Sequence, residues 1–381
     1  MTDLAAVLEE LRAAGLFREL REVESAQGAR VRLDGREVVL LCSNDYLGLA
    51  GDARLRAAAA EYAERWGAGA GASRLVSGGM VPHRRLEEEL AAFKGTEACL
   101  LFGSGFLANT GVVAALAGPG DVVLSDARNH ASIVDGCRLA RAQTVVYPHA
   151  DLDALGHALA AVSGRDAVIV TDAVFSMDGD LAPLTGIVEL ARRHGARVVV
   201  DEAHATGVVG ATGRGLVAEL GLEGEVDVVV GTLGKALGSY GAFVCCDRRT
   251  ASFLVNRART LIYSTALPPP SLGAALEGLR ILREEPDRVA RLHANARLLR
   301  SGLGLPPDPM PIVPLVIGEP DAATAACRAA LERGVFAQAI RPPTVPEGTS
   351  RLRLVAMATH TGADLRRAAA VLRRRHATAA G

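Results

Sequence analysis

Short apolar runs alternate with longer helical segments over most of this chain, and that alternation constrains the possible folds more than any other feature. Helical spacing of apolar residues is found in the segments 52–66, 82–93, 105–117, 151–162 and 184–194. The apolar runs are Ala98–Phe102, Val122–Leu124, Thr144–Tyr147, Ala167–Thr171, Arg197–Asp201 and Val226–Val230. Continuous apolar strands separated by helices form a mostly parallel sheet that helices cover on both faces. The sequence therefore predicts the α/β fold class.

The two ends of the chain have different patterns. Residues 3–15 predict a helix, and Asp34-Gly35 between the apolar runs Arg30–Leu33 and Glu37–Leu41 predicts a β-hairpin. After three prolines at 268–270, a long helix is expected at 271–302, followed by strands Val313–Ile317 and Arg351–Ala356 and by helices 321–333 and 362–375. We therefore expect three parts: an N-terminal arm (1–51), a large domain (52–270) and a smaller C-terminal α/β domain (271–381).

Charge and composition argue against several functional classes. The 42 Lys and Arg residues nearly balance 43 Asp and Glu residues, so the chain has no excess of positive charge for binding nucleic acid. The apolar stretches are interrupted well before the roughly 18 residues that a membrane span requires. The acidic, amphipathic N-terminus is unlike a secretory signal. Six cysteines without a CxxC pair, and histidines without ligand spacing, predict a reduced cytoplasmic protein with no metal site.

Two glycine-rich segments match nucleotide-binding motifs only superficially. Residues Gly67–Ala72 fit G-x-G-x-x-G/A, but a helical segment precedes them where a dinucleotide-binding motif requires a strand. Gly234-Lys235 lacks the earlier glycine of a P-loop, and Ala236 stands where that motif needs serine or threonine. Neither segment predicts a nucleotide site.

The chain contains only two lysines, Lys94 and Lys235, among its 42 basic residues. Arginine stays protonated and cannot act as an amine nucleophile, so any Schiff-base chemistry must use one of these two. Lys94 precedes Gly95 at a predicted helix end, which is typical of a solvated lysine. Lys235 follows an apolar strand in a glycine-rich turn, with Thr232 three residues before it. Because glycines allow a ligand to approach the backbone closely, Lys235 is the stronger candidate.

Two further segments suggest what Lys235 would act with. Asp201 and His204 follow an apolar strand at its carboxyl end, where α/β sheets bind ligands, and an aspartate there could pair with a pyridinium nitrogen or simply cap the next loop. Ser104-Gly105-Phe106 lies between a strand and a helix, where free amides bind anions. A lysine, a strand-end aspartate and a phosphate-binding helix start together describe a pyridoxal 5'-phosphate (PLP) enzyme.

Seven segments, in the same order and nearly end to end, resemble the α-oxoamine synthases, a family of PLP enzymes. They are SNDYLGL (43–49), SRLVSG (73–78), FSMDGD (175–180), DEAHATG (201–207), GTLGKALG (231–238), YSTALPP (263–269) and IRPPTVPEGTSRLRL (340–354). The resemblance implies the aspartate aminotransferase-like fold (fold type I), in which residues 52–270 would bind PLP. It also implies a homodimer with active sites at the interface.

The resemblance assigns roles at matching positions. The catalytic residues would be Lys235, which holds the cofactor covalently and acts as base, Asp201, which pairs with the ring nitrogen, and His130, which stacks on the ring and helps bind or protonate the reacting group. The other cofactor-binding residues would be Gly105, Phe106 and Thr232 at the phosphate, Ser176 and His204 near the ring hydroxyl, and Thr265 at a neighbouring subunit's phosphate.

Substrate-binding positions follow from the same motifs. Arg341 would bind the amino-acid carboxylate through its two-pronged guanidinium. Asn44 and His130 would lie near the reacting centre, and Arg18 and Thr344 would contact the acyl substrate. Two positions depart from the family pattern. Asp172 stands where glutamate is expected, with a shorter reach, and Asn129 stands where serine is usual, with little effect expected.

The implied activity is an acyl transfer. An L-alanine and a pimeloyl thioester, carried by coenzyme A or acyl carrier protein, would be condensed with loss of carbon dioxide, as in biotin biosynthesis. Sister reactions on the same scaffold remain alternatives: glycine C-acetyltransferase, 5-aminolevulinate synthase and serine palmitoyltransferase. A non-catalytic PLP-binding regulator is a more distant alternative, because it would need a DNA-binding domain that the sequence does not indicate.

Overall fold

The computed structural model describes residues 2–373. The chain forms two compact units. Unit 1 comprises the chain up to Gly48, the short segment Met177–Gly179 and the chain from Ala290 onward, and unit 2 comprises Leu49–Ser176 and Asp180–Val289. These units are defined by spatial compactness, and the three-part division at residues 1–51, 52–270 and 271–381 stays a prediction.

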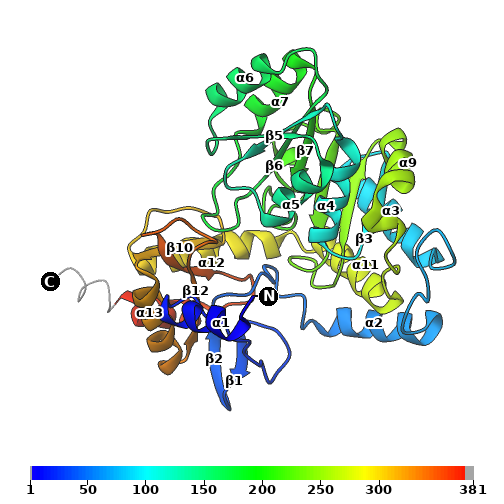
Figure 1. Cartoon of the computed structure of the whole chain (residues 1–381). Helices are drawn as coiled ribbons and strands as arrows, with labels where there is room; N and C mark the ends of the chain where they lie inside the picture. Colours follow the sequence, from blue (N-terminus) through cyan, green and yellow to red (C-terminus); the bar gives the residue numbers. More distant parts are fainter. Residues whose placement is uncertain (1, 374–381) are drawn as a thin grey trace. The chain divides into compact units, whose positions relative to one another are not determined.

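Unit 2 is built on a seven-stranded sheet with the order β3-β9-β8-β7-β6-β4-β5 (Figure 1). Its strands are β3 (Ala98–Phe102), β4 (Val122–Asp126), β5 (Gln143–Tyr147), β6 (Ala167–Asp172), β7 (Arg197–Asp201), β8 (Val228–Thr232) and β9 (Ala242–Cys246). Strands β4 to β8 pair in parallel, and β9 is antiparallel to β3 and β8. The predicted mostly parallel sheet is confirmed. Strand β9 was missed because a glycine-rich turn, not a helix, connects it to β8.

Helices cover both faces of this sheet. The helices of unit 2 are α2 (Ala53–Trp66), α3 (Val81–Lys94), α4 (Gly105–Leu116), α5 (Ala131–Ala140), α6 (Leu152–Ala161), α7 (Leu184–His194), α8 (Leu216–Glu219), α9 (Arg248–Arg257), α10 (Arg259–Ile262) and α11 (Pro269–Glu284). Buried residues of α4, α5, α9 and α10 form one apolar cluster with β3, β4 and β6 to β9. Helices α3, α6 and α7 also contact the strands but contribute nothing to that cluster, which places them on the other face.

Unit 1 contains two small three-stranded sheets. Strands β1 (Arg30–Leu33) and β2 (Arg36–Leu40) form the predicted hairpin and are joined by β11 (Val335–Phe336). The second sheet has the order β10-β13-β12, with β10 (Ile312–Gly318), β12 (Gln338–Ile340) and β13 (Ser350–Val355). Its core includes residues from α12 (Asp287–Leu303), α13 (Pro320–Glu332) and α14 (Gly362–Arg373). The predicted second α/β pattern is therefore confirmed.

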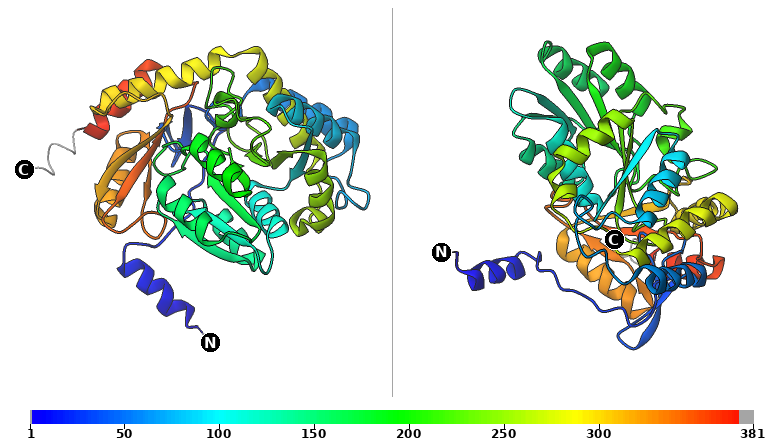
Figure 2. Two further views of the ribbon diagram at one scale, coloured as in Figure 1. Left: turned by 90° about the horizontal axis from the view of Figure 1, so that it is seen from above. Right: turned by 90° about the vertical axis from the view of Figure 1, so that its right-hand side faces the viewer.

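The first helix, α1 (Leu4–Ala13), has no buried residue. Leu4, Val7, Leu8 and Leu11 form its predicted apolar face, and all four are exposed. Figure 2 shows α1 standing away from the sheets of unit 1, connected to them by an extended segment. Asp3 caps the helix by accepting hydrogen bonds from the amides of Ala5 and Ala6.

Two predicted helices differ in extent. The single helix expected at 271–302 is two helices, α11 and α12, which break around Pro286 because proline lacks the amide hydrogen that a continuous helix needs. The helix expected at 362–375 is α14, which is described to Arg373, and residues 374 and 375 lie outside the described part of the chain. Helices α5, α8, α9 and α10 were not among the predicted segments.

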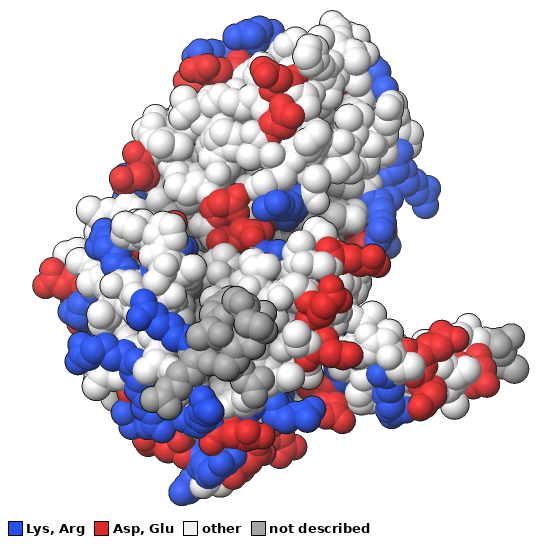
Figure 3. Space-filling view, turned by 90° about the vertical axis from the view of Figure 1, so that its left-hand side faces the viewer, with Lys and Arg blue, Asp and Glu red and all other residues white. Residues whose placement is uncertain are grey.

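Charged side chains of both signs are interspersed on the face that Figure 3 displays, so this face carries no continuous basic stripe. Among residues 2–373, no helix combines the length and the apolar composition needed to cross a membrane.

Gly231 in β8 is required by packing against the neighbouring strand. It pairs with Phe243 of β9, and a Cβ at this position would lie 2.1 Å from Cζ of the Phe243 ring. We expect Gly231→Ala to lower the free energy of unfolding by about 1–3 kcal/mol, the usual result of overpacking a core. Gly69→Ala is the matched control, because no atom lies within 4 Å of its Cβ position. Urea unfolding measures both variants, and equal midpoints would contradict this account of β8.

Candidate active site

Three neighbouring parallel strands of unit 2 end in polar residues. Strand β6 ends at Asp172, β7 at Asp201 and β8 at Thr232. Asp172 and Asp201 are register partners, so their Cα atoms lie side by side. The carboxyl ends of parallel strands are where α/β sheets bind ligands, and this edge of the sheet is therefore the candidate site.

Asp201 is buried and is held by two donors. Its Oδ1 accepts a hydrogen bond from the backbone amide of Ala203 at 2.7 Å, and its Oδ2 accepts one from Nδ2 of Asn109 at 2.6 Å. Asn109 lies on α4 and is 1% exposed. Two donors on two oxygens favour the ionised carboxylate, the form that can pair with a protonated ring nitrogen. Asn109 was not predicted from the sequence.

Asp172 lies beside Asp201 but has a different protonation preference. Its Oδ2 accepts a hydrogen bond from the backbone amide of His130 at 2.8 Å. Burial raises the pKa of Asp172 well above its usual range, and the nearby charge of Asp201 raises it further. Two adjacent buried carboxyls cannot both ionise cheaply. Asp172, with a single backbone donor, is the one whose pKa is raised, whereas two donors stabilise the carboxylate of Asp201.

The expectation that Asn129 has little effect is wrong. Its side chain is buried and connects β4 to β6: Nδ2 donates to Oγ of Ser125 and to the carbonyl of Val170, and Oδ1 accepts from the amide of Asp172. Asn129 therefore fixes the strand end that positions Asp172 and the start of α5. A serine side chain is too short to make all three bonds.

Lys235 lies in the turn after β8, with its Nζ 2.7 Å from Nε2 of His204. An ammonium group can only donate, so Nε2 of His204 is the acceptor when Lys235 is protonated. His204 is buried and follows β7, so the two residues reach each other from neighbouring strand ends. The structure thus brings the two predicted residues together.

His130 is the N-cap residue of α5. Its Nδ1 lies 2.7 Å from Oγ of Ser132 and 3.2 Å from the amide nitrogen of the same residue. Partial loss of water around the ring lowers the pKa of His130. The positive charge of Lys235 also lowers it, and Asp201 opposes the shift. His130 is therefore neutral near pH 7 and lies within the electrostatic reach of both Asp201 and Lys235.

The start of α4 suits a phosphate group. Ser104 caps the helix by accepting from the amide of Leu107, and the backbone at Gly105 is open, with no atom within 4 Å of a Cβ placed there. Phe106 is 45% exposed at the same helix start. Thr232 Oγ1 accepts from the amide of Gly234 and donates to the carbonyl of Gly241. The N-terminus of a helix attracts anions, so these residues fit the phosphate of PLP.

The side chains of this edge fit the rest of PLP as well. One amine, one buried carboxylate and one neutral imidazole are the groups that a pyridine aldehyde needs for attachment, for charge pairing and for stacking. Within residues 2–373, no group of three or more His, Cys, Asp and Glu side chains could hold a metal ion. Ser176, predicted near the ring hydroxyl, is half-buried in the loop between Val174 and Leu181, which form an isolated bridge. Thr265 is exposed and bridges to Ser73.

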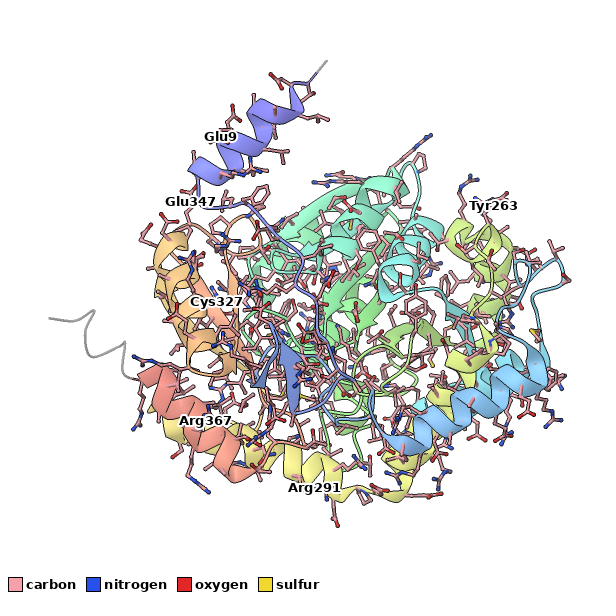
Figure 4. The ribbon with its side chains drawn as sticks, turned by 90° about the horizontal axis from the view of Figure 1, so that it is seen from below. Glu9, Tyr263, Arg291, Cys327, Glu347 and Arg367 are labelled. Carbon is pink, nitrogen blue, oxygen red and sulfur yellow. The ribbon has the colours of Figure 1, made fainter. Side chains whose placement is uncertain are left out.

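The predicted substrate-binding residues belong to unit 1. Arg18, Arg341 and Thr344 line one cleft of about 690 Å³, together with Cys327 on α13, which is labelled in Figure 4. The Arg341 guanidinium donates to the backbone carbonyls of Gly15 and Phe17. Asn44 is not part of this cleft, and its Oδ1 accepts from the Arg353 guanidinium at 3.1 Å. The three cleft residues are thus grouped, and Asn44 is placed apart from them.

The prediction that Lys94 is a solvated helix-end lysine is wrong. Its side chain is 3% exposed, and Nζ donates to Oε2 of Glu202 at 2.5 Å, to Oγ1 of Thr206 at 2.8 Å and to the carbonyl of Arg214 at 2.6 Å. Three acceptors match the three hydrogens of an ammonium group, a geometry that a planar guanidinium does not reproduce. Because Glu202 follows Asp201 directly, this ion pair fixes the chain beside the candidate site.

Comparison with known proteins agrees with this arrangement. A sequence model of the family described as aminotransferase class I and II matches residues 36–372. The fold also matches a serine palmitoyltransferase variant from S. paucimobilis solved with a bound PLP–myriocin aldimine, with a TM-score of 0.93 and 32% identity over 99% of this chain and 97% of that chain. The protein is therefore a PLP-dependent enzyme of fold type I.

Curated relatives narrow this class. An 8-amino-7-oxononanoate synthase from Anaeromyxobacter dehalogenans (strain 2CP-1 / ATCC BAA-258) is 53% identical over 95% of this chain and 92% of its own length. The enzyme of the same name from Geobacter sulfurreducens is 51% identical over 98% and 97%. A solved 8-amino-7-oxononanoate synthase from Francisella tularensis matches with a TM-score of 0.77 and 27% identity, over 90% of this chain and 99% of that chain. The chain belongs to the 8-amino-7-oxononanoate synthase family.

The buried Lys94–Glu202 pair gives a stability prediction. Lys94→Met leaves the carboxylate of Glu202 buried and unpaired, so we expect the free energy of unfolding to fall by about 3–5 kcal/mol. The double variant Lys94→Met/Glu202→Gln removes the buried charge, and its stability should be partly restored. Urea unfolding measures both.

Arg84→Met is the control, because the Arg84–Glu88 pair on the same helix is largely exposed and should contribute little. A Lys94→Met variant as stable as Arg84→Met would refute the structural role of the pair.

Proposed function

We propose that this enzyme condenses L-alanine with a pimeloyl thioester and releases 8-amino-7-oxononanoate, carbon dioxide and the free thiol, as a step of biotin biosynthesis. The observation that carries the proposal is the carboxyl edge of the unit 2 sheet, where Asp201 ends β7, Lys235 follows β8 and His130 caps α5. The substrate assignment is supported by identities of 48–53% to relatives named 8-amino-7-oxononanoate synthase. Serine palmitoyltransferases resemble the backbone closely but are only 31–32% identical.

The residues of unit 2 account for the chemical steps. PLP, when bound, supplies an electron-accepting ring that stabilises negative charge on the α-carbon of the amino acid. Lys235 holds the cofactor and then takes the proton from that α-carbon through its Nζ. Its Nζ lies 2.7 Å from Nε2 of His204, which orients the amine for proton transfer. Asp201, held by two donors, would supply the negative charge that keeps the ring nitrogen of the bound cofactor protonated.

The bonds made and broken on the substrates balance. The α-carbon of alanine, having lost its proton, bonds to the thioester carbonyl carbon, and the carbon–sulfur bond breaks to release the thiol. The resulting β-keto acid loses its carboxylate as carbon dioxide. A proton then replaces the carboxylate, and we assign its delivery to His130 or Lys235. Arg341 is proposed to bind the alanine carboxylate, with Asn44 near the reacting centre and Arg18 and Thr344 at the acyl substrate.

We further propose that the enzyme acts in the cytoplasm as a homodimer. Thr265, which is exposed on unit 2, would then contribute to the phosphate site of the partner subunit, as its motif predicts. Phe106, Ser176, Gly105 and Thr232 complete the proposed cofactor contacts within one chain.

A product assay tests the proposed reaction directly. The PLP-loaded protein is given pimeloyl-CoA, pimeloyl-ACP or acetyl-CoA with L-alanine, glycine or L-serine, and the products are identified by mass spectrometry. We expect 8-amino-7-oxononanoate as the dominant product with L-alanine. If glycine condenses with acetyl-CoA and alanine condenses with neither pimeloyl thioester, the proposed reaction is wrong and the enzyme is a glycine C-acetyltransferase.

Lys235→Ala should abolish turnover. Loss of both the covalent attachment and the base is expected to reduce kcat at least about 10³-fold, within the range of a missing general base. Lys235→Arg is the charge-preserving control and should be equally inactive, because a guanidinium stays protonated. Product formation by either variant at the native rate would show that Lys235 is neither the attachment point of the cofactor nor the base.

A further inference from the structure

A continuous chain of hydrogen bonds connects the strand-end carboxylate Asp201 to the imidazole of His130 through two residues that no motif assigned. Asn109 on α4 donates from Nδ2 to Asp201 Oδ2 at 2.6 Å and to Ser132 Oγ at 2.9 Å. Ser132 Oγ in turn lies 2.7 Å from Nδ1 of His130. Asn109 and Ser132 are both essentially inaccessible to solvent, at 1% and 0% exposure.

The direction of each bond follows from the groups involved. The amide of Asn109 has two hydrogens, and one goes to each acceptor. Rotating the amide by half a turn would place Oδ1 against the carboxylate of Asp201, so that two acceptors would face each other. The orientation shown leaves Oδ1 of Asn109 without a hydrogen-bond partner in the described part of the chain. Leaving Oδ1 buried without a partner costs free energy. The two bonds that Asn109 donates offset this cost, because a hydrogen bond to a carboxylate is stronger than one between neutral groups.

The tautomer of His130 is then determined. Because Ser132 Oγ accepts from Asn109, its own hydrogen is free to donate to Nδ1 of His130. The backbone amide of Ser132, which can only donate, also lies against Nδ1, at 3.2 Å. Two donors at one ring nitrogen require that Nδ1 carries no proton, so the neutral imidazole carries it on Nε2.

We propose that Asn109 and Ser132 are positioning residues of this enzyme: Asn109 holds Asp201 as an oriented carboxylate, and Ser132 holds His130 as the Nε2–H tautomer. The inference rests on the proposed cofactor site. His130 thereby presents a hydrogen-bond donor to the substrate, while Asp201 keeps its negative charge for the ring nitrogen. A histidine of the opposite tautomer would present a lone pair and could not donate at the same position.

The charged and titratable groups around His130 are consistent with this arrangement. Asp172 at the end of β6 binds its backbone amide, Asp201 lies at the end of β7, and Lys235 follows β8. None of these three is bonded to Nδ1, which leaves Ser132 as the residue that sets the tautomer. Asp172 instead fixes the backbone from which the imidazole extends.

Two variants of the full-length protein separate the two parts of the proposal. Asn109→Leu removes both donated bonds at similar side-chain size, and we expect the dissociation constant for PLP to rise at least about tenfold, as for loss of a hydrogen bond to a charged group. Ser132→Ala keeps the direct Asn109–Asp201 bond but belongs to the same hydrogen-bond network, so the dissociation constant for PLP should rise less than in Asn109→Leu. If Asn109→Leu does not fold, Asn109→Ser gives the same test, because its side chain is too short to reach both acceptors.

The second measurement follows the ring nitrogens of His130 by NMR of protein labelled with ¹⁵N-histidine, with His130→Asn used to assign the signals. In the native protein, Nδ1 should resonate as an unprotonated nitrogen and Nε2 as a protonated one. In Ser132→Ala the two shifts should move toward each other as both tautomers become populated. Cys137→Ala, a buried change on the same helix α5, should leave the spectrum and PLP affinity unchanged.

The proposal fails if Asn109→Leu or Asn109→Ser binds PLP like the native protein, or if Ser132→Ala leaves the shifts of His130 unchanged. Equal effects of Cys137→Ala would also overturn it, because they would indicate a general disturbance of α5. Neither measurement depends on which amino acid or thioester is used. The proposed substrates could therefore be wrong while these results stand.

Discussion

The structure of the site depends on one electrostatic constraint: Asp172 and Asp201 end neighbouring strands in register and are both buried, so only one of them can be charged. Their surroundings decide which. Asp201 receives two donors, one from a side chain on α4, whereas Asp172 receives a single backbone amide and the field of its neighbour. The same contacts attach both α4 and α5 to the sheet edge. The hydrogen bonds to Asp172 and Asp201 thus determine both the charge distribution of the site and the placement of α4 and α5.

Much of this arrangement could be predicted from the sequence, because its main parts are local. Asp201 and Lys235 each follow an apolar strand directly, and a strand end can be recognised from a few residues. Asn109 was missed because it acts on Asp201, which lies far along the chain. Ser132 is close to His130 in sequence but was missed because the direction of its hydrogen bond depends on the distant Asn109. One signal was available: Asn109 is a lone amide inside the almost wholly apolar helix of residues 105–116, and a buried polar group there requires a partner. Strand β9 was missed for a related reason, since an antiparallel strand after a long turn does not fit the alternation of helices and strands.

The two lysines are kept at positions that arginine cannot fill, but for different reasons. In a chain whose other basic residues are all arginine, each retained lysine marks a position that arginine cannot fill. At Lys235 the reason is chemical, because a nucleophilic amine is needed. At Lys94 the reason is geometric, because three acceptors surround a single nitrogen in a space closed to solvent. Treating Lys94 as a surface residue rested on its place at a helix end, and that location also lets a long side chain reach across to Glu202 on another segment.

The catalytic groups differ in how firmly their backbone is held, and the difference matches what each must do. Asp201 and His130 sit at a strand end and a helix start, where hydrogen bonds from other elements fix them. Lys235 sits in a turn shaped by glycines. Gly238 has a φ of +64°, and a Cβ there would lie 2.6 Å from the backbone of Leu49. The turn is therefore held by close packing of its backbone, while the lysine side chain extends from it on four rotatable bonds. Lys235 must first hold the cofactor and later move a proton, so its backbone must be fixed while its amine stays mobile. The tightly packed glycine turn fixes the backbone, and the long side chain leaves the amine mobile.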